Sequence, residues 1–232
     1  MKSSFTPVVL GLIIINVAIH LVSLAMYDKI SPIRNNYLVL SKGGTGDLLG
    51  LRDEGTRYGK FNVTQTLGSA FGHSIRHSHT NGQVVFQQSL FHILMNMMCL
   101  FFIGPAVERR MGSISFLIFY LFAAIVGGFI TAFIDPALNP VLGASGAISG
   151  MLVAFAWLYP HAKLGLLFIP IHLPARVFTA IFAIFSLIMI ILEVSGKSVL
   201  GGVSHFGHLA GMIAGFIFML GYQLLGKTKS AV

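Results

Sequence analysis

Six long apolar runs follow one another along the chain, and they constrain its fold more than any other feature. They lie near residues 5–26, 86–107, 113–134, 143–159, 173–192 and 199–225, and each contains few or no charged residues. A membrane-spanning helix needs about 20 mostly apolar residues. We therefore predict an all-α membrane protein that folds as a single domain over residues 1–232, with six membrane-spanning helices and a long first loop at 27–85.

The amino-acid composition agrees with this interpretation. Hydrophobic residues make up 55% of the chain and charged residues 9%, whereas soluble domains average about 25% charged residues. These values exclude an ordinary soluble enzyme, a disordered protein and a collagen-like chain. The single cysteine, Cys99, excludes an intrachain disulfide and a cysteine-based metal site.

The formal net charge of +8 could indicate a nucleic-acid partner, but the positive-inside rule explains it better. One side of the predicted membrane domain carries seven basic residues, namely Lys2, Arg109, Arg110, Lys163, Arg176, Lys227 and Lys229. The short loops on the other side carry only Lys197. The first loop holds seven further basic residues, but its length is close to that at which the rule weakens. We therefore predict that both termini are cytoplasmic and that the chain binds no nucleic acid.

The first apolar run could instead be a cleaved signal peptide. Lys2 precedes the run, and Ser23-Leu24-Ala25 is a passable cleavage site. The run is longer than the apolar core of a usual signal peptide, however, and this favours a helix that is retained in the membrane.

A polar pair lies inside the second run. His92 and Asn96 are four residues apart, so both lie on one face of a helix. Polar groups at membrane depth are costly and usually face a protein interior or a watery cavity. Hydrogen bonding between helices would explain the pair equally well.

A serine opens the fourth run, within Gly143-Ala144-Ser145-Gly146. At a helix N-terminus the first backbone N–H groups lack partners, so a serine there could use them to stabilise an oxyanion. A simple N-cap is the alternative. About 17 residues from Gly143 to Tyr159 give roughly 25 Å of helix against about 30 Å of hydrocarbon. We therefore expect the serine end to be sunken and to face a hydrated pocket.

The sixth run contains His205 and His208. If its helix starts near Val199, His208 lies about 13 Å along the axis, and His92 lies about 9 Å into the second span. Small residues four apart let helices approach closely, and the chain has three such pairs, namely Gly146/Gly150, Ser145/Ser149 and Gly211/Gly215. Close packing of the fourth and sixth spans would bring Ser145 to His208, although such pairs also occur where no catalysis takes place.

Four blocks in this order resemble the rhomboid intramembrane serine proteases. They are His92-Ile93-Leu94-Met95-Asn96, Gly104-Pro105-Ala106-Val107-Glu108-Arg109-Arg110, Gly143-Ala144-Ser145-Gly146 and His208-Leu209-Ala210-Gly211. Each block alone is a weak signal. Together, on the second, fourth and sixth of six spans, they are specific, and they imply a rhomboid-like bundle of bacterial type.

The resemblance implies a role for each matching residue. Ser145 would be the nucleophile and His208 the general base, with no cofactor and no metal. His92, Asn96 and Ala144 would bind the oxyanion or the substrate. The remaining matches would be structural, namely Glu108, Arg110, Gly143, Gly146, Gly211 and Gly215.

The chain departs from the family in the groups around its base. No Asp or Glu lies in a span near His208, so a third triad member is absent. The family often has an aromatic residue four positions after the nucleophile, where this chain has Ser149, and a hydroxyl hydrogen bond is the expected substitute. His205 and His208, three residues apart, could be metal ligands, but the absence of an HExxH motif argues against a membrane metalloprotease. His205 is instead expected to pack beside the base or to support it from behind.

The first loop departs from the family too. A Trp-Arg pair that is frequent there is missing, since the corresponding segment reads Val63-Thr64-Gln65-Thr66. Residues 73–88 look like an insertion that carries three histidines, namely His73, His77 and His79. Loop histidines without Cys or carboxylate neighbours usually bind no metal.

The predicted function is a serine endopeptidase of the bacterial inner membrane. Its partners would be membrane lipids and transmembrane protein substrates, cut where Gly, Pro or polar residues weaken the substrate helix. Two alternatives stay open, namely a catalytically inactive protein that binds membrane clients and a small transporter that uses His and Asn as a polar path. The sequence gives no prediction of the oligomeric state.

Overall fold

The computed structural model describes residues 6–25, 71, 76–80, 83–87, 90–134, 144–165, 172–197 and 203–227. These residues form six helices, namely α1 (Pro7–Ala25), α5 (Leu90–Met111), α6 (Ser113–Ile134), α7 (Ser145–Leu158), α8 (Ala175–Val194) and α9 (His205–Leu224). They also form four short strands, namely β1 (Arg76–Thr80), β2 (Gln83–Gln87), β3 (Lys163–Gly165) and β4 (His172–Pro174). Among the residues named in the sequence analysis, the segment 63–66 and Gly143 lie outside the described residues.

Four helices are long and apolar enough to cross a membrane, so the chain is a mostly helical, multi-pass membrane protein. The candidate spans are Leu90–Met111, Ser113–Thr131, Ala175–Val194 and His205–Leu224. Two shorter apolar helices, Pro7–Val22 and Ser145–Leu158, complete the set within the described residues. At about 1.5 Å per residue, the 14 residues of α7 reach roughly 21 Å, which is less than a bilayer core.

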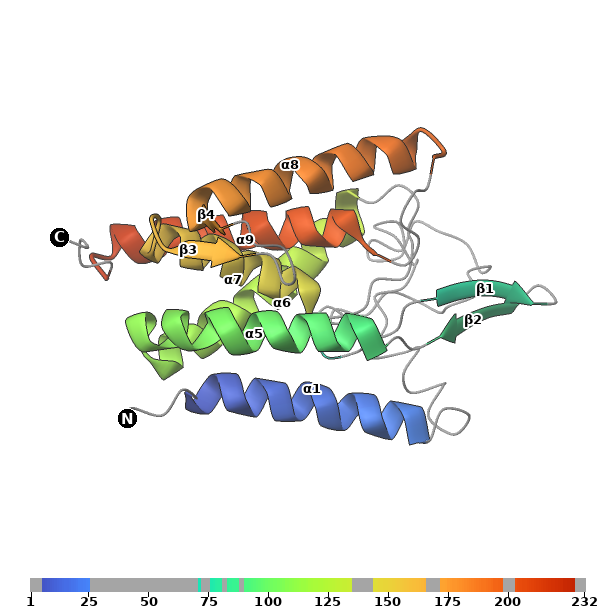
Figure 1. Ribbon diagram of the computed structural model, residues 1–232, viewed down its shortest axis with the longest axis horizontal. Helices are drawn as coiled ribbons and strands as arrows, with labels where there is room; N and C mark the ends of the chain where they lie inside the picture. The colour runs from blue at the N-terminus through green and yellow to red at the C-terminus, as the bar shows by residue number, and fades with distance from the viewer. Residues whose placement is uncertain are drawn as a thin grey trace, which may run out of the picture.

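Helix α7 lies at the centre of the bundle (Figure 1). Nine of its 14 residues are buried, and it contacts α5, α6, α8 and α9. Helix α1 packs on the far side of α5, and α8 lies along the outer side of α9 (Figure 1). The shortest helix is thus enclosed by the longer ones, which present their apolar outer faces to lipid.

The prediction of an all-α chain is wrong for two small antiparallel sheets. Strand β1 pairs with β2, with Thr80 opposite Gln83, inside the segment interpreted as an insertion in the first loop. The two residues between them are Asn81-Gly82, and the second strand is rich in valine and phenylalanine. This pattern favours a two-residue hairpin. Strands β3 and β4 form the second sheet, with Lys163 opposite Pro174.

Two helix starts also differ from the predictions. Helix α5 begins at Leu90 rather than near 86, because residues 83–87 form strand β2. Helix α9 begins at His205 rather than near Val199, because Ser204 caps it: its hydroxyl accepts a hydrogen bond from the Gly207 N–H at 3.0 Å. The depths estimated for the site residues from the earlier starts are therefore wrong.

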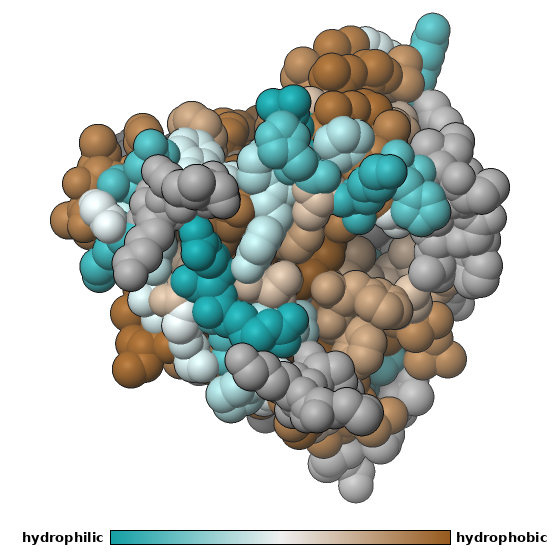
Figure 2. All heavy atoms as spheres, turned by 60° about the vertical axis from the view of Figure 1, so that its left-hand side comes forward, coloured by the Kyte–Doolittle hydropathy of each residue, from teal (hydrophilic) through white to brown (hydrophobic). Residues whose placement is uncertain are grey.

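The two ends of the bundle differ in character. Helices α5, α7 and α9 begin at one end, where α1, α6 and α8 finish, and this is called the site end below (right in Figure 1). At the opposite end Figure 2 shows hydrophilic side chains gathered around the helix termini. The exposed basic residues described there are Arg109, Arg110, Lys163, Arg176 and Lys227.

Glu108 ties three segments together at the opposite end. Its side chain is 1% exposed, and its carboxylate accepts hydrogen bonds from the Val8 N–H at 3.1 Å, the Val9 N–H at 2.8 Å and the Ser113 hydroxyl at 2.6 Å. The first N–H groups of a helix lack partners and carry partial positive charge. The carboxylate therefore caps α1 and joins it to the turn between α5 and α6, where Gly112 adopts a φ of 84°. Arg110, two residues further along α5, is exposed.

Candidate active site

A glycine seam joins α7 to α9. Gly146 and Gly150 of α7 face Gly211 and Gly215 of α9. A Cβ on Gly211 would overlap the Gly146 carbonyl, and a Cβ on Gly215 would lie 2.6 Å from the Gly150 Cα. Only glycine therefore permits this backbone contact. Two of the three small-residue pairs predicted from the sequence, Gly146/Gly150 and Gly211/Gly215, lie on opposite sides of it.

Ser145 is the first residue of α7, at the site end. Ala144 precedes it at the cap position, fully buried and without a capping side chain, so the alternative that Ser145 is the N-cap is wrong. The N–H groups of this first turn have no acceptor within the helix. The partly exposed Ser145 therefore lies beside backbone donors that have no acceptor in their own helix, at the positive end of a helix dipole.

His208 is the fourth residue of α9 and lies on the other side of the seam. A Cβ on Gly146 would lie 3.3 Å from the Gly207 carbonyl oxygen. The backbone contact thus joins the residue that follows Ser145 to the residue that precedes His208. The seam brings the serine and the histidine to neighbouring positions from segments more than 60 residues apart in sequence.

Aromatic rings rather than hydrogen bonds surround the His208 imidazole. Its centroid lies 5.4 Å from that of Phe182 in α8 and 5.9 Å from that of His205. Within the described residues, Nδ1 of His208 has no hydrogen-bond partner. His205 is 3% exposed and packs against Phe185 at 5.8 Å, which places it in the packing role expected from the sequence.

His92 and Asn96 lie on α5, near the same end. Asn96 is 4% exposed, and its side-chain amide donates to the His92 carbonyl oxygen at 3.0 Å. His92 lies within electrostatic range of His208. The polar groups of α5 therefore lie on the side of the bundle where α9 presents His208.

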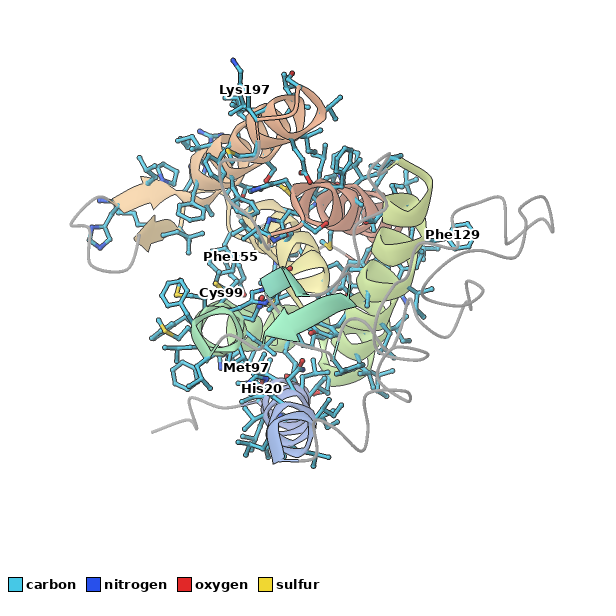
Figure 3. The ribbon with its side chains drawn as sticks, turned by 90° about the vertical axis from the view of Figure 1, so that its right-hand side faces the viewer. His20, Met97, Cys99, Phe129, Phe155 and Lys197 are labelled. Atoms are coloured by element: carbon cyan, nitrogen blue, oxygen red, sulfur yellow. The ribbon has the colours of Figure 1, made fainter. Side chains whose placement is uncertain are left out.

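A second polar pair, on α1, was missed from the sequence. Asn16 and His20 are fully buried or nearly so, at 0% and 3% exposure, and His20 lies within electrostatic range of His92. Figure 3 shows His20 between α1 and α5. The signal was present, because these residues are four apart in an apolar run, as His92 and Asn96 are.

The antiparallel packing of α1 on α5 explains this juxtaposition. Val9 contacts Gly104: a Cβ added at Gly104 would lie only 2.8 Å from the Val9 Cγ2. His20 is eleven residues after Val9 on α1, and His92 is twelve residues before Gly104 on α5. In two antiparallel helices these positions lie at the same level. Helices that run in opposite directions keep this pairing at equal rise per residue.

Some predicted site residues are placed elsewhere or not described. Gly143 and His73 lie outside the described residues. His77 and His79 lie on strand β1, opposite Phe86 and Val84. Among the described residues, no group of three or more His, Cys, Asp or Glu side chains is placed to hold a metal ion.

The arrangement can support acyl transfer. It combines a serine at a helix start, a histidine across a rigid seam and polar side chains of a third helix near that histidine. Acyl transfer needs a nucleophile, a base and oxyanion donors, and residue types suited to each are present here.

Comparison with known proteins gives a family match. The family model described as "Rhomboid domain" matches residues 82–224, more than half of the chain. The chain is 32% identical to Rhomboid protein 1, mitochondrial, of Saccharomyces cerevisiae, over 45% of its own length and 28% of the relative's. It is 30% identical to Rhomboid protease GluP of Bacillus subtilis, over 57% of its own length and 24% of the relative's.

A third relative gives similar values. The chain is 30% identical to human Presenilin-associated rhomboid-like protein, mitochondrial, over 61% of its own length and 37% of the relative's. The matches therefore span between 24% and 37% of these relatives' lengths.

Proposed function

Because the chain belongs to the rhomboid family, we propose that it is an intramembrane serine endopeptidase with a dyad of Ser145 and His208. The observation that carries the proposal is the glycine seam, which holds the start of α7 against the first turn of α9. The printed name of one relative, a rhomboid protease, supports the same activity.

The proposed reaction proceeds through an acyl-enzyme. The Ser145 oxygen attacks the carbonyl carbon of the scissile peptide bond, while a ring nitrogen of His208 takes the hydroxyl proton. His208 then gives this proton to the leaving amine as the C–N bond breaks. Water, deprotonated by His208, hydrolyses the ester, and the proton returns to Ser145. A general base must be neutral to begin this cycle.

The oxyanion would be stabilised by donors from two helices. The backbone N–H groups of the first turn of α7, next to Ala144, point toward the end at which Ser145 lies. His92 and Asn96 of α5 would add side-chain donors, and Asn96 is already held by its bond to the His92 carbonyl oxygen. Preorganised donors of this kind stabilise developing negative charge without reorganisation.

The reaction would need only two side chains for proton transfer. No Asp or Glu lies within α9, and Nδ1 of His208 lacks an acceptor among the described residues. The orientation that a carboxylate gives the imidazole in a triad must come from packing.

We place the protein as a six-span rhomboid-like bundle in the bacterial inner membrane, with both termini cytoplasmic. The opposite end carries Arg109, Arg110, Lys163, Arg176 and Lys227, whereas Lys197 lies beyond the end of α8 at the site end (Figure 3). This distribution follows the positive-inside rule. The site end then faces outward, and the short α7 leaves Ser145 below the membrane surface.

The proposed substrates are transmembrane segments of other membrane proteins. A helical peptide bond is shielded by its own backbone hydrogen bonds, so a cleavable segment should contain Gly, Pro or polar residues that weaken its helix. Such segments would reach the site from the surrounding lipid. The proposed reaction uses no cofactor.

The test compares purified wild type with Ser145→Ala and His208→Ala on a panel of model transmembrane substrates. Fluorophosphonate labelling of the serine runs in parallel. Ser195→Ala and His172→Ala are matched controls, because both residues are exposed and lie on α8's end and on β4. Cleavage and labelling that disappear only in the two dyad variants would support the protease.

The opposite result would favour another function. If folded wild type neither cleaves nor labels, the proposal fails and a client-binding protein takes its place. Solute flux in liposomes that survives Ser145→Ala would favour a transporter instead.

A further inference from the structure

The His208 imidazole needs an orienting contact that is not a hydrogen bond. Within the described residues its Nδ1 is buried without a partner. A base that turns freely about its side-chain bonds spends little time directed at the nucleophile, and this lowers the rate of proton transfer.

Ser149 does not supply this contact by donation. Its hydroxyl donates to the Ser145 carbonyl oxygen at 2.7 Å, one turn back along α7. A hydroxyl has only one proton to donate, so that of Ser149 is used within its own helix. The hydrogen bond expected to replace an aromatic ring at this position is therefore directed elsewhere.

Helix α8 supplies rings instead. Phe182 and Phe185 are three residues apart on α8, as His205 and His208 are on α9. The Phe182 ring lies 5.4 Å from that of His208 at an interplanar angle of 36°, and the Phe185 ring lies 5.8 Å from that of His205 at 78°. Both contacts are within the range of favourable aromatic pairs.

The histidines also contact each other. The ring planes of His205 and His208 are 88° apart with centroids 5.9 Å apart. The His208 ring is thus held from two directions, by the Phe182 ring from α8 and by the edge-to-face contact with His205.

We propose that Phe182 is the positioning residue for the general base His208, and that α8, rather than the helix of the nucleophile, sets the orientation of this imidazole. The inference rests on the proposed function, since it concerns the base of that reaction. Phe182 acts through His208 and need not touch the substrate.

Helix α8 is more exposed than the other candidate spans, and this affects how firmly it can hold the His208 ring. Among the four candidate spans, 22% of the most apolar stretch of α8 is buried inside the protein, against 39% for each of the others. It contacts α7 and α9 and the strands of the second hairpin. The base is therefore oriented by the most lipid-exposed of these spans, and its alignment depends on how well α8 is docked.

The activity test uses Phe182→Leu, which removes the ring but keeps apolar bulk, and Phe182→Tyr, which keeps the ring. Ile184→Leu is the matched control, since Ile184 is 58% exposed on the same helix. We expect Phe182→Leu to lower kcat by about 2- to 12-fold with KM unchanged. Phe182→Tyr and Ile184→Leu should stay within about twofold of wild type. Rates are expressed per fluorophosphonate-reactive site, so that loss of folded protein does not count.

A spectroscopic arm separates this inference from the proposed function. In histidine-labelled Ser145→Ala protein, the ring resonances of His208 are assigned by comparison with His208→Gln. Phe182→Leu should move them, because the ring current of the phenylalanine is lost, and Ile184→Leu should not. This readout does not depend on catalysis.

Each result decides one of the two ideas. If wild type neither cleaves nor labels, the protease fails, while a shifted His208 resonance still supports the contact. An unmoved resonance in Phe182→Leu would overturn the positioning role. So would a kcat equal to wild type, or an equal loss in Phe182→Leu and Phe182→Tyr.

Discussion

Helix α9 meets its two neighbours by different means. Against α7 the contact is backbone on backbone, since Gly211 and Gly215 lie on Gly146 and Gly150 with no room for a methyl group. Against α8 it is side chain on side chain, through the rings of Phe182 and Phe185. The first contact fixes where the backbones of Ser145 and His208 lie, and the second fixes how one ring is turned.

The two contacts should therefore fail differently. A close-packed seam cannot accept added volume without a shift of backbone, which moves both proposed catalytic residues together. A ring contact can be weakened by degrees, because neighbouring side chains and lipid can fill part of the space.

The largest effect is expected at the seam. Gly211→Ala places a methyl group on the Gly146 carbonyl, so α7 and α9 must separate. We expect cleavage to fall by at least about 100-fold, since a displacement of about 1 Å in a catalytic group has this effect. The free energy of unfolding should fall by about 1–3 kcal/mol. Cleavage assays and thermal unfolding in detergent measure both quantities.

Gly221→Ala on the same helix is the matched control. Nothing lies within 4 Å of a Cβ at Gly221. Its activity should be that of wild type, and its stability should be unchanged or raised by up to about 1 kcal/mol, because alanine favours a helix over glycine. If the two alanine variants behave alike, the seam is not what holds the site.

The second effect is expected at the opposite end, where hydrogen bonds replace close packing. Glu108→Gln keeps the shape of the side chain but removes its charge and replaces one accepting oxygen with an NH2 group, which cannot accept from Val8, Val9 or Ser113. We expect the free energy of unfolding to fall by about 1–3 kcal/mol. The kcat per fluorophosphonate-reactive site should change by less than about twofold, because Glu108 lies at the far end from Ser145.

Ser113→Ala is the graded companion of this variant. It removes one of the three donors, and a loss of about 1 kcal/mol or less is expected. A large fall in kcat per site in either variant would mean that the two ends are coupled, and that the seam alone does not position the dyad.

Local sequence patterns predict the contact between α7 and α9. Glycines at Gly146, Gly150, Gly211 and Gly215 indicate a seam because their spacing is fixed by the helical repeat. The resemblance to the rhomboid family, carried by four short blocks, is confirmed by the family match. The mostly helical membrane fold also follows from the apolar runs, since each run is about as long as a bilayer is thick.

The contact between α8 and α9 could not be predicted from local sequence. Phe182 is one of 20 phenylalanines, and nothing in its own segment indicates that its ring meets His208. That contact depends on how α8 is rotated and docked, which only the tertiary packing determines. Strands β1 and β2 are a different case, because the turn sequence Asn81-Gly82 lies between them and is itself a local hairpin signal. Asn16 and His20 carried a readable signal in their spacing.

The smallest effect is expected from the polar contact that joins α8 to α7. The Thr179 hydroxyl donates to the Ala175 carbonyl oxygen at 2.8 Å and approaches the Leu152 carbonyl oxygen at 3.5 Å. Hydrogen bonds between membrane helices average about 0.6 kcal/mol, and a contact at 3.5 Å is at the long limit. Thr179→Val should therefore lower the free energy of unfolding by about 0.5 kcal/mol or less.

Its effect on catalysis tests whether α8 docking is shared among many contacts. If the rings of Phe182 and Phe185 hold α8 in place, Thr179→Val should change kcat by less than about twofold and leave the His208 ring resonances unmoved. A fall in kcat as large as that of Phe182→Leu, with a shifted His208 resonance, would mean that one hydroxyl controls the docking of α8. The ring contact would then depend on that hydroxyl rather than hold the helix by itself.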